Sequence, residues 1–171
     1  MRIIGGRHAG MALTSPSGRV RPTAEPVRAA AIALLDGALE NARVLDLFAG
    51  AGTFGLEALS RGAASCDFVE NGPSAIHALK ANVAMLRARD RTRIFTKDAI
   101  LFADRLPAGA YDLAYADPPY DSRKLDRILE TWQRTPFART LVLEHAADHD
   151  VPKPARSRRV EDTVLSVYES S

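Results

Sequence analysis

The sequence predicts an α/β protein with a doubly wound, mostly parallel seven-stranded sheet, a Rossmann-like arrangement that ends in an antiparallel C-terminal hairpin. From Arg43 onward, short apolar runs alternate with segments of helical periodicity, which is the pattern of a parallel sheet with helices on both faces. The last two apolar runs follow each other without a helix between them, so they predict the hairpin. At 171 residues with 46% apolar content, the chain can bury one core of ordinary size.

The N-terminal residues form a segment of their own in this scheme. Residues 1–22 hold short apolar stretches around glycines, a pattern that favours a β-hairpin carrying several basic residues. Residues 23–171 form the second predicted unit. This unit opens with a helix in which Thr23 is the expected N-cap, Pro26 lies in the first turn, and apolar residues recur at helical spacing as far as Leu39.

The remaining elements are expected to alternate along the chain. Most of the predicted strands are short stretches rich in apolar residues, and the helices have apolar residues three or four positions apart. Gly62 ends one helix and Pro73 begins the next. The strands are expected at residues 43–48, 65–70, 92–96, 111–116, 139–144, 158–160 and 163–168, and the helices between them at residues 53–61, 73–87, 99–106 and 125–132.

Composition excludes several classes of protein. No apolar run approaches the ~20 residues of a membrane span, and the N-terminus has no signal-peptide pattern. We therefore expect a cytoplasmic monomer without a membrane partner. Cys66 is the only cysteine, which excludes an internal disulfide, and we expect it to be a packed thiol. The four histidines form no metal-binding pattern, so we predict no metal site.

A glycine-rich loop follows the first predicted strand. The spacing Gly50-x-Gly52-x-x-Gly55 lets the backbone turn tightly and approach a ligand at a helix N-terminus, although packing turns and dinucleotide dehydrogenases share it. The chain is too short for the second domain of a dehydrogenase. Asp46, four residues before the loop, would repel a pyrophosphate but suits a cationic amino-acid group. These features favour S-adenosylmethionine as the cofactor, because it has such a group and no phosphate.

Two further carboxylates follow neighbouring strands. Glu70 is predicted to accept both hydroxyls of a ribose, and its alternative is an ordinary charge at a strand end. Asp98 is predicted to accept an adenine amino hydrogen, and its alternative is a helix cap. The predicted cofactor contacts come from three strand ends and their loops: Asp46, Phe48, Ala49, Gly50, Gly52, Gly55, Glu70, Asn71, Asp98 and Ala99.

The most informative stretch is Asp117-Pro118-Pro119-Tyr120, directly after a predicted strand. Two consecutive prolines end that strand, because each fixes φ and lacks an N–H. The turn can hold a planar amine: the Asp117 carboxylate and the Pro118 carbonyl would accept its two N–H groups, and the Tyr120 ring would stack on the base. We predict these four residues as the catalytic site of a methyltransferase that acts on an amino group. The alternative is a rigid turn that only closes the sheet.

Arginines concentrate near the N-terminus. The first 30 residues hold five arginines against a single acidic residue. Such a cluster can bind a phosphate backbone, and the alternative is a solvated surface. The predicted substrate-binding residues are Arg2, Arg7, Arg19, Arg21 and Thr23.

Several stretches of the chain together match the pattern of a known family. They are residues 1–6, 21–23, 44–52, 55–64, 68–70, 117–120, 143–145 and 162–168. On these residues, the chain resembles the bacterial guanine-N2 methyltransferases of small-subunit ribosomal RNA, the RsmD-like group of class I methyltransferases. One departure is the segment 25–29, where the arginine and the glutamate that are usual in the family are replaced by Pro26 and Ala29.

The resemblance implies that residues 23–171 form a methyltransferase domain that uses S-adenosylmethionine. It implies methylation of an exocyclic guanine N2 amine, with ribosomal RNA or a partly assembled small subunit as the partner. Three alternatives remain open. An adenine-N6 methyltransferase acting on DNA or RNA would use the same acceptors, a protein-glutamine methyltransferase would favour Asn at position 117, and a relative that only binds RNA could keep the fold.

Overall fold

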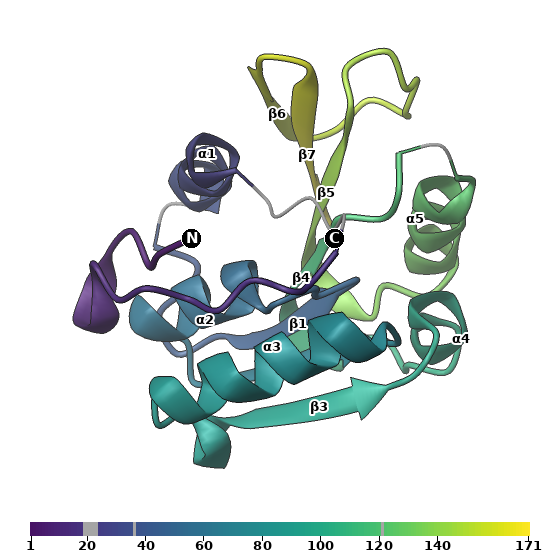
Figure 1. Ribbon diagram of the computed structural model, residues 1–171. Coiled ribbons are helices and arrows are strands. Elements are labelled where there is room, and N and C mark those ends of the chain that lie inside the picture. The colour runs from purple at the N-terminus through teal and green to yellow at the C-terminus, as the bar shows by residue number, and fades with distance from the viewer. Residues whose placement is uncertain (19–23, 36, 121) are drawn as a thin grey trace.

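The described residues form one mixed sheet of seven strands (Figure 1). The computed structural model describes residues 1–18, 24–35, 37–120 and 122–171. The strands are β1 (Arg43–Leu47), β2 (Ser65–Glu70), β3 (Thr92–Thr96), β4 (Tyr111–Ala116), β5 (Ala138–Ala146), β6 (Arg156–Val160) and β7 (Thr163–Glu169). Their order is β3-β2-β1-β4-β5-β7-β6. Strands β1 to β5 run parallel, and β7 pairs antiparallel with β5 and β6, which confirms the predicted sheet.

Helices cover both faces of this sheet (Figure 1). The α-helices are α1 (Glu25–Leu35), α2 (Thr53–Ser60), α3 (Pro73–Met85), α4 (Ala99–Ala103) and α5 (Lys124–Arg134), and two 3-10 helices, η1 (Gly6–His8) and η2 (Arg89–Arg91), complete the elements. Apolar side chains of α1, α2 and α3 pack with one face of the sheet, and those of α4 and α5 pack with the other. The sheet is therefore doubly wound, as predicted, and its strand order reverses between β1 and β4.

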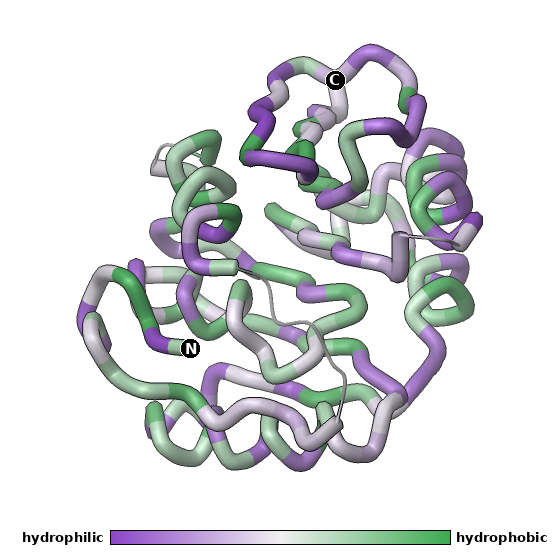
Figure 2. Tube along the Cα trace, turned by 45° about the horizontal axis from the view of Figure 1, so that its top comes forward, coloured by the Kyte–Doolittle hydropathy of each residue, from purple (hydrophilic) through white to green (hydrophobic). Residues whose placement is uncertain are grey.

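Burial differs sharply between the centre and the edges of the sheet. In β1 and β4 every residue but one is buried, and in β5 six of nine residues are buried, which explains their apolar runs. Hydrophobic segments accordingly run through the middle of the molecule in Figure 2. The edge strands differ: four of the five residues of β6 are exposed, and each of the five residues of β3 is exposed or partly buried. The core therefore lies on both sides of β1, β4 and β5.

The predicted and observed elements differ mainly at their ends. Strands β2, β3 and β4 occupy the predicted residues. Helix α1 stops at Leu35 instead of continuing to Leu39, because Gly37 adopts a φ of +78° and the chain turns there. Leu39 is still buried, but from a turn. Helix α4 ends at Ala103, three residues before the predicted end, and Thr23, the predicted N-cap of α1, lies outside the described residues.

Residues 1–14 form a short antiparallel ribbon. Arg2 and Ala12 make an antiparallel bridge. Ile3 and Leu13 are buried in the same apolar cluster as α1 and α2. The pairing is of the kind expected for this segment, while the division of the chain after residue 22 stays a prediction.

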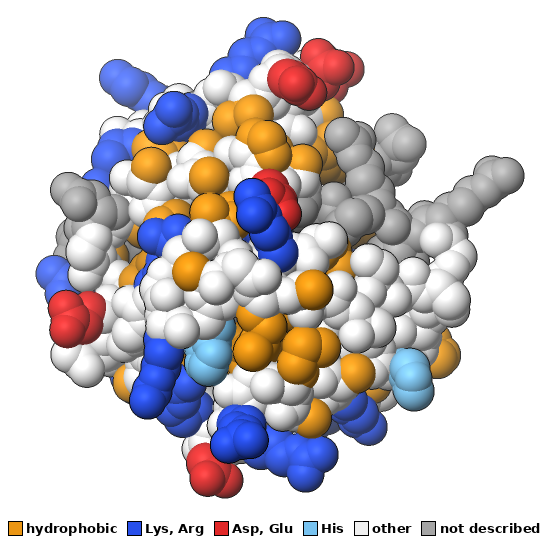
Figure 3. Space-filling view, turned by 60° about the vertical axis from the view of Figure 1, so that its left-hand side comes forward, with side chains coloured by type: hydrophobic (Ala, Val, Ile, Leu, Met, Phe, Trp, Pro, Cys, Tyr) orange, Lys and Arg blue, Asp and Glu red, His pale blue; other side chains and the backbone are white. Residues whose placement is uncertain are grey.

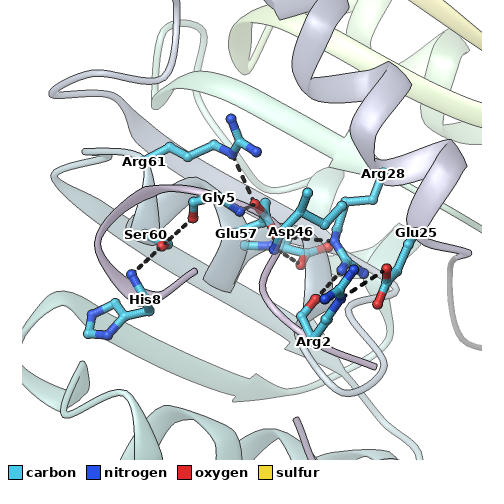
Figure 4. A network of polar contacts seen from close by, with 11 residues as sticks. Arg2, Gly5, His8, Glu25, Arg28, Asp46, Glu57, Ser60 and Arg61 are labelled. Carbon is cyan, nitrogen blue, oxygen red and sulfur yellow. Dashed lines mark hydrogen bonds and ion pairs between the residues drawn. The ribbon is translucent and has the colours of Figure 1, made fainter. Parts of the chain in front are cut away.

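One buried carboxylate fixes the ribbon to two helices (Figure 4). Glu57 of α2 is fully buried and accepts hydrogen bonds from the backbone N–H groups of Ile4 and Gly5, both at 2.9 Å. It also pairs with Arg28 of α1 at 3.3 Å and with Arg61 at 2.9 Å. Arg28 is itself fully buried. The ribbon, α1 and α2 therefore share a single acidic anchor.

Within the described ranges, no helix has the length and apolar character needed to cross a membrane. In the same ranges, no group of three or more His, Cys, Asp or Glu side chains is placed to hold a metal ion. Cys66 is fully buried, as predicted, and burial raises the pKa of its thiol well above the usual value. The thiol is therefore a packed, unreactive group.

Candidate active site

A cavity of about 690 Å³ opens at the carboxyl ends of β1, β2 and β4. It lies where the strand order reverses, which is the place where open α/β sheets bind ligands. Its volume is in the range of roughly 300–1,000 Å³ that is typical of small-molecule sites. Its walls include residues 48–51, 70–75 and 117–120. The glycine loop and the Asp-Pro-Pro-Tyr turn, which are far apart in the sequence, thus line one cavity.

The glycine loop contributes its backbone to the cavity wall. Gly50 has a φ of +57°, and its N–H donates to the Glu70 carboxylate at 2.8 Å. A Cβ at Gly50 would meet no atom within 4 Å, so the backbone itself faces open space in the cavity. Phe48 and Ala49 line the same wall, so three of the predicted contacts form one continuous surface that a ligand can approach closely.

The two other glycines of the motif do not line this cavity. A Cβ at Gly52 would come within 2.4 Å of Leu79, and one at Gly55 within 2.4 Å of Phe68. These glycines are required for close packing of α2 against β2 and α3. The spacing of the motif therefore combines one position that faces the cavity with two that allow the loop to sit tightly on the core.

Asp46 lies behind the loop rather than in the cavity wall. Its side chain is buried, and its Oδ2 accepts the N–H of Gly55 at 3.0 Å. Burial raises the pKa of this carboxyl well above its usual value, the bond from Gly55 opposes that rise, and the carboxylates of Asp117 and Glu70 add to it. Asp46 thus fixes the start of α2, and its predicted role toward a cationic group stays a prediction.

Glu70 holds the loop and also lines the cavity. Its Oε2 accepts from Gly50, and its Oε1 accepts from the N–H groups of Asn71 and Gly72 at 3.0 and 2.9 Å. Asn71 is exposed and lines the cavity too. The carboxylate is therefore held in a fixed position at the end of β2, where the predicted ribose contact would be made.

The turn after β4 forms another part of the cavity wall. Asp117, Pro118, Pro119 and Tyr120 all line the cavity, with Pro118 buried and Pro119 exposed. The Pro119 carbonyl accepts the hydroxyl of Ser122 at 2.7 Å, which braces the turn from outside. The carboxylate, the prolines and the ring are thus presented together, as the sequence predicted, and their catalytic roles stay predictions.

Side chains from β5 and β7 hold this turn in place. The Tyr120 hydroxyl hydrogen-bonds to Thr163 Oγ1 at 2.8 Å and donates to Glu144 Oε1 at 3.4 Å. The Tyr115 hydroxyl donates to Glu144 Oε2, and the Tyr115 ring stacks on Phe54 with centroids 3.9 Å apart. Burial, followed by the charge of Glu144, raises the pKa of Tyr115 well above its usual value, so this phenol remains a hydrogen-bond donor.

Asp98 and Ala99 do not line this cavity. The Asp98 side chain accepts the N–H of Leu101 at 3.0 Å and caps α4, which is the alternative that the sequence left open. Ala99 is buried among the residues that pack α4 against the sheet. Their contact with an adenine ring stays a prediction.

Of the predicted substrate-binding residues, the structure describes two. The Arg2 side chain is exposed and pairs with Glu25 at 3.4 Å, and Arg7 is exposed on η1. The face in Figure 3 carries basic side chains in several separate groups. Arg19, Arg21 and Thr23 lie outside the described residues.

Four residues of the site were missed by sequence reasoning. Lys124 lines the cavity with its Nζ 5.9 Å from the centre of the Phe48 ring. Asn82 of α3 donates to the carbonyls of Ala51 and Thr14, both at 3.0 Å, and so ties the loop to the N-terminal ribbon. The other two are Glu144 and Thr163. Glu144 had a detectable signal, because it is the last residue of the predicted strand 139–144 and the carboxyl ends of neighbouring parallel strands meet at one edge of the sheet.

Known proteins resemble this chain in sequence and in fold. The family model described as "Conserved hypothetical protein 95" matches residues 1–164. YlbH of Bacillus subtilis, named as a candidate rRNA methyltransferase, is 31% identical over 159 residues, which are 90% of this chain and 86% of that protein. The ribosomal RNA small subunit methyltransferase D of Escherichia coli is 36% identical over 121 residues, which are 70% of this chain and 60% of that protein.

Solved structures share the fold of this chain. YhhF of Escherichia coli, described as a candidate methyltransferase, is 28% identical with a TM-score of 0.85 over 99% of this chain and 97% of that one. A hypothetical protein of Thermus thermophilus is 27% identical with a TM-score of 0.85 over 99% of both chains. At 18% identity, an RNA methyltransferase of Salinibacter ruber in complex with S-adenosyl-L-homocysteine shares the fold, with a TM-score of 0.65 over 87% of this chain and 93% of that one.

Proposed function

This chain belongs to the RsmD-like methyltransferase family, the one described as Conserved hypothetical protein 95, and from that premise we propose that it methylates the N2 amine of a guanine in small-subunit ribosomal RNA. S-Adenosylmethionine is its methyl donor. The relatives' names support the ribosomal RNA part of this proposal. The guanine N2 part rests on the resemblance and on the chemistry of the site.

The observation that carries the proposal is the shared cavity. One wall is the backbone at Gly50 with the Glu70 carboxylate beside it, and another wall is the turn that begins at Asp117. The residues present fit S-adenosylmethionine, because the first wall has open space against the backbone and an acidic group at the end of β2. A flat base can then enter between that wall and the turn.

The chain's own contribution to the reaction is positioning and proton transfer. The sulfonium of S-adenosylmethionine supplies an electrophilic methyl group, so the protein has to hold the amine in line with it and raise the electron density on nitrogen. In the proposal, Asp117 accepts one N–H of the amine and the Pro118 carbonyl accepts the other. As nitrogen gains the methyl group, Asp117 takes the proton that nitrogen loses. The Tyr120 ring stacks on the base and fixes its plane.

The proposed substrate sets further conditions. A paired guanine has to leave its stack before its amine can reach the cavity, so an unpaired or loop nucleotide is the favoured target. The N-terminal arginines would contact phosphates nearby, and the cytoplasm is where such RNA is found. The departures from the family at Pro26 and Ala29 lie on exposed positions of α1, so we expect them to affect RNA contact rather than the cavity.

The experiment is methyl transfer onto small ribosomal subunits from a strain that lacks this protein. Labelled S-adenosylmethionine is added with the enzyme, the RNA is digested to nucleosides, and the labelled nucleoside is identified and then mapped. The expected product is N2-methylguanosine at one position. Label in N6-methyladenosine would replace the proposal by the adenine alternative, and absence of label together with absence of cofactor binding would indicate a relative that only binds RNA.

A further inference from the structure

Two carboxylates lie side by side, one just past the end of β4 and the other within β5. The parallel register pairs Ala116 with Leu143, so the next residues along the two strands are Asp117 and Glu144. Neighbouring strands are about 4.8 Å apart. Both residues line the cavity. An amine held by Asp117 therefore brings the adjacent atoms of its base close to Glu144.

Glu144 is fixed in this position by its surroundings. It is only 5% exposed and receives hydrogen bonds from the hydroxyls of Tyr115 and Tyr120. Thr163 holds the Tyr120 hydroxyl from the other side. A carboxylate accepts up to about four hydrogen bonds, so Glu144 can hold both tyrosines and also accept from a ligand. In a buried wall, a mismatched ligand group has no water to compensate for the lost bond.

Building on the proposed function, we propose that Glu144 is the residue that selects guanine, by accepting the N1–H that lies next to the N2 amine. Among the four RNA bases, only guanine has an amine beside a ring N–H. Adenine and cytosine have a ring nitrogen with a lone pair beside their amines, and that lone pair would face the carboxylate. Asp117 and Glu144 thus offer two neighbouring acceptors, which match the N2 amine and the N1–H of guanine.

The expected discrimination is large. A site built to hydrogen-bond a substrate N–H rejects an analogue that lacks it by up to about 10⁴- to 10⁵-fold, because the buried partner is left unpaired. Glu144 keeps its two tyrosine donors when the ligand donor is lost, so we expect a smaller effect, about 100-fold in kcat/KM.

The test uses RNA with an altered base at the position mapped by the methyl-transfer experiment, inserted by ligation and assembled into small subunits. 2-Aminopurine keeps the 2-amine but has a lone pair at N1. 6-Thioguanine keeps both the amine and the N1–H but has sulfur at position 6. The wild-type enzyme is expected to methylate 6-thioguanine within about tenfold of guanine and 2-aminopurine about 100-fold more slowly. Similar rates on guanine and 2-aminopurine overturn the proposal without any variant.

Two variants locate the effect. In Glu144→Gln, the side-chain amide can donate to N1 of 2-aminopurine and its oxygen can still accept from guanine, so the preference for guanine is expected to fall below about tenfold. Thr163→Val is the matched control, because it loosens the Tyr120 hydroxyl in the same wall. It is expected to slow both substrates equally and leave the preference unchanged. A preference that persists in Glu144→Gln, or that falls equally in Thr163→Val, refutes the role of Glu144.

Failure of this inference is distinguishable from failure of the proposed function. If the function is wrong, the wild-type enzyme forms no N2-methylguanosine on unaltered subunits. If only the inference is wrong, N2-methylguanosine forms, but the choice between guanine and 2-aminopurine does not depend on Glu144.

Discussion

Replacing Glu57 by glutamine tests how the N-terminal ribbon is held against α1 and α2. Glu57 is fully buried and accepts four hydrogen bonds, two from the backbone N–H groups of Ile4 and Gly5 and two from Arg28 and Arg61. Glutamine has nearly the same shape but only one acceptor oxygen and no charge. One backbone N–H loses its partner, and the buried guanidinium of Arg28 loses its counter-ion.

The size of the effect follows from these contacts. Breaking a buried ion pair by removing one partner costs about 3–5 kcal/mol, because the remaining charge is uncompensated. A domain of this size changes its Tm by about 2–4 °C per kcal/mol, so Glu57→Gln is expected to melt about 6–20 °C below the wild type. The matched control is Glu130→Gln, an exposed position on α5 for which we expect a change within about 0.5 kcal/mol.

The assay is urea unfolding, monitored by far-UV circular dichroism. Glu57→Gln should lower the midpoint without changing the slope. Adding Arg28→Met should recover part of the loss, because an apolar side chain replaces the orphaned charge. Equal free energies of unfolding for Glu57→Gln and Glu130→Gln would show that the anchor contributes nothing and that the ribbon is held by its apolar contacts alone.

Changes in the site separate cofactor binding from methyl transfer. Asp117→Ala should reduce methyl transfer about 10²- to 10⁴-fold with cofactor affinity unchanged by calorimetry; retained turnover would remove Asp117 from the mechanism. Glu70→Ala should weaken cofactor binding about 10- to 100-fold, and an unchanged Kd would exclude its ribose role. Asp46→Asn keeps an acceptor for the N–H of Gly55 but removes the titratable carboxyl group. Burial raises the pKa of Asp46 in the folded protein. Its contribution to stability is therefore complete below the unfolded pKa of ~3.9 and is lost as pH rises through the folded pKa. The Tm of Asp46→Asn minus the Tm of the wild type should therefore increase as pH rises above about 4. A Tm difference that does not change with pH would contradict the argument. Simultaneous alanine substitution of Arg2, Arg7, Arg19 and Arg21 should weaken binding of small-subunit RNA. In a plot of log K against log salt concentration, the slope should become shallower by up to about 3. An unchanged slope would exclude phosphate contacts by these four arginines.

The strands could be predicted because each carries its own signal. A buried parallel strand is a short apolar run, as in β4, and an edge strand such as β3 keeps β-branched and aromatic residues; β2, β3 and β4 all begin and end at the predicted residues. Helix ends were less predictable, because apolar spacing continues through turns that are also buried. Leu39 fits the helical pattern of α1 yet lies beyond it, since Gly37 had already turned the chain.

The candidate site was predictable where a residue with suitable chemistry stands at the carboxyl end of a predicted strand. The turn at Asp117 and the acid at Glu70 follow strands, and the topology brings such ends together. The separate roles of Gly50 and Gly55 were not predictable. A glycine that faces a cavity and a glycine that packs against Phe68 both require the absence of a Cβ, so the sequence pattern is the same. Glu57 and Asn82 look like ordinary polar residues of helices. Their partners in the N-terminal ribbon lie more than 50 residues away in the sequence, and no local pattern reports such a contact.

The two borders of the sheet bear on how the protein behaves at high concentration. A strand at a border offers unpaired N–H and C=O groups to which another chain can add. On β6 the first four residues are exposed, and three of them are arginines. On β3 the Arg93 side chain is largely exposed above the ring of Phe95. On β3 this arginine is paired with Asp67, whereas two molecules meeting at their β6 borders would bring exposed arginines together, so strand addition and fibril growth are discouraged at the β6 end of the sheet.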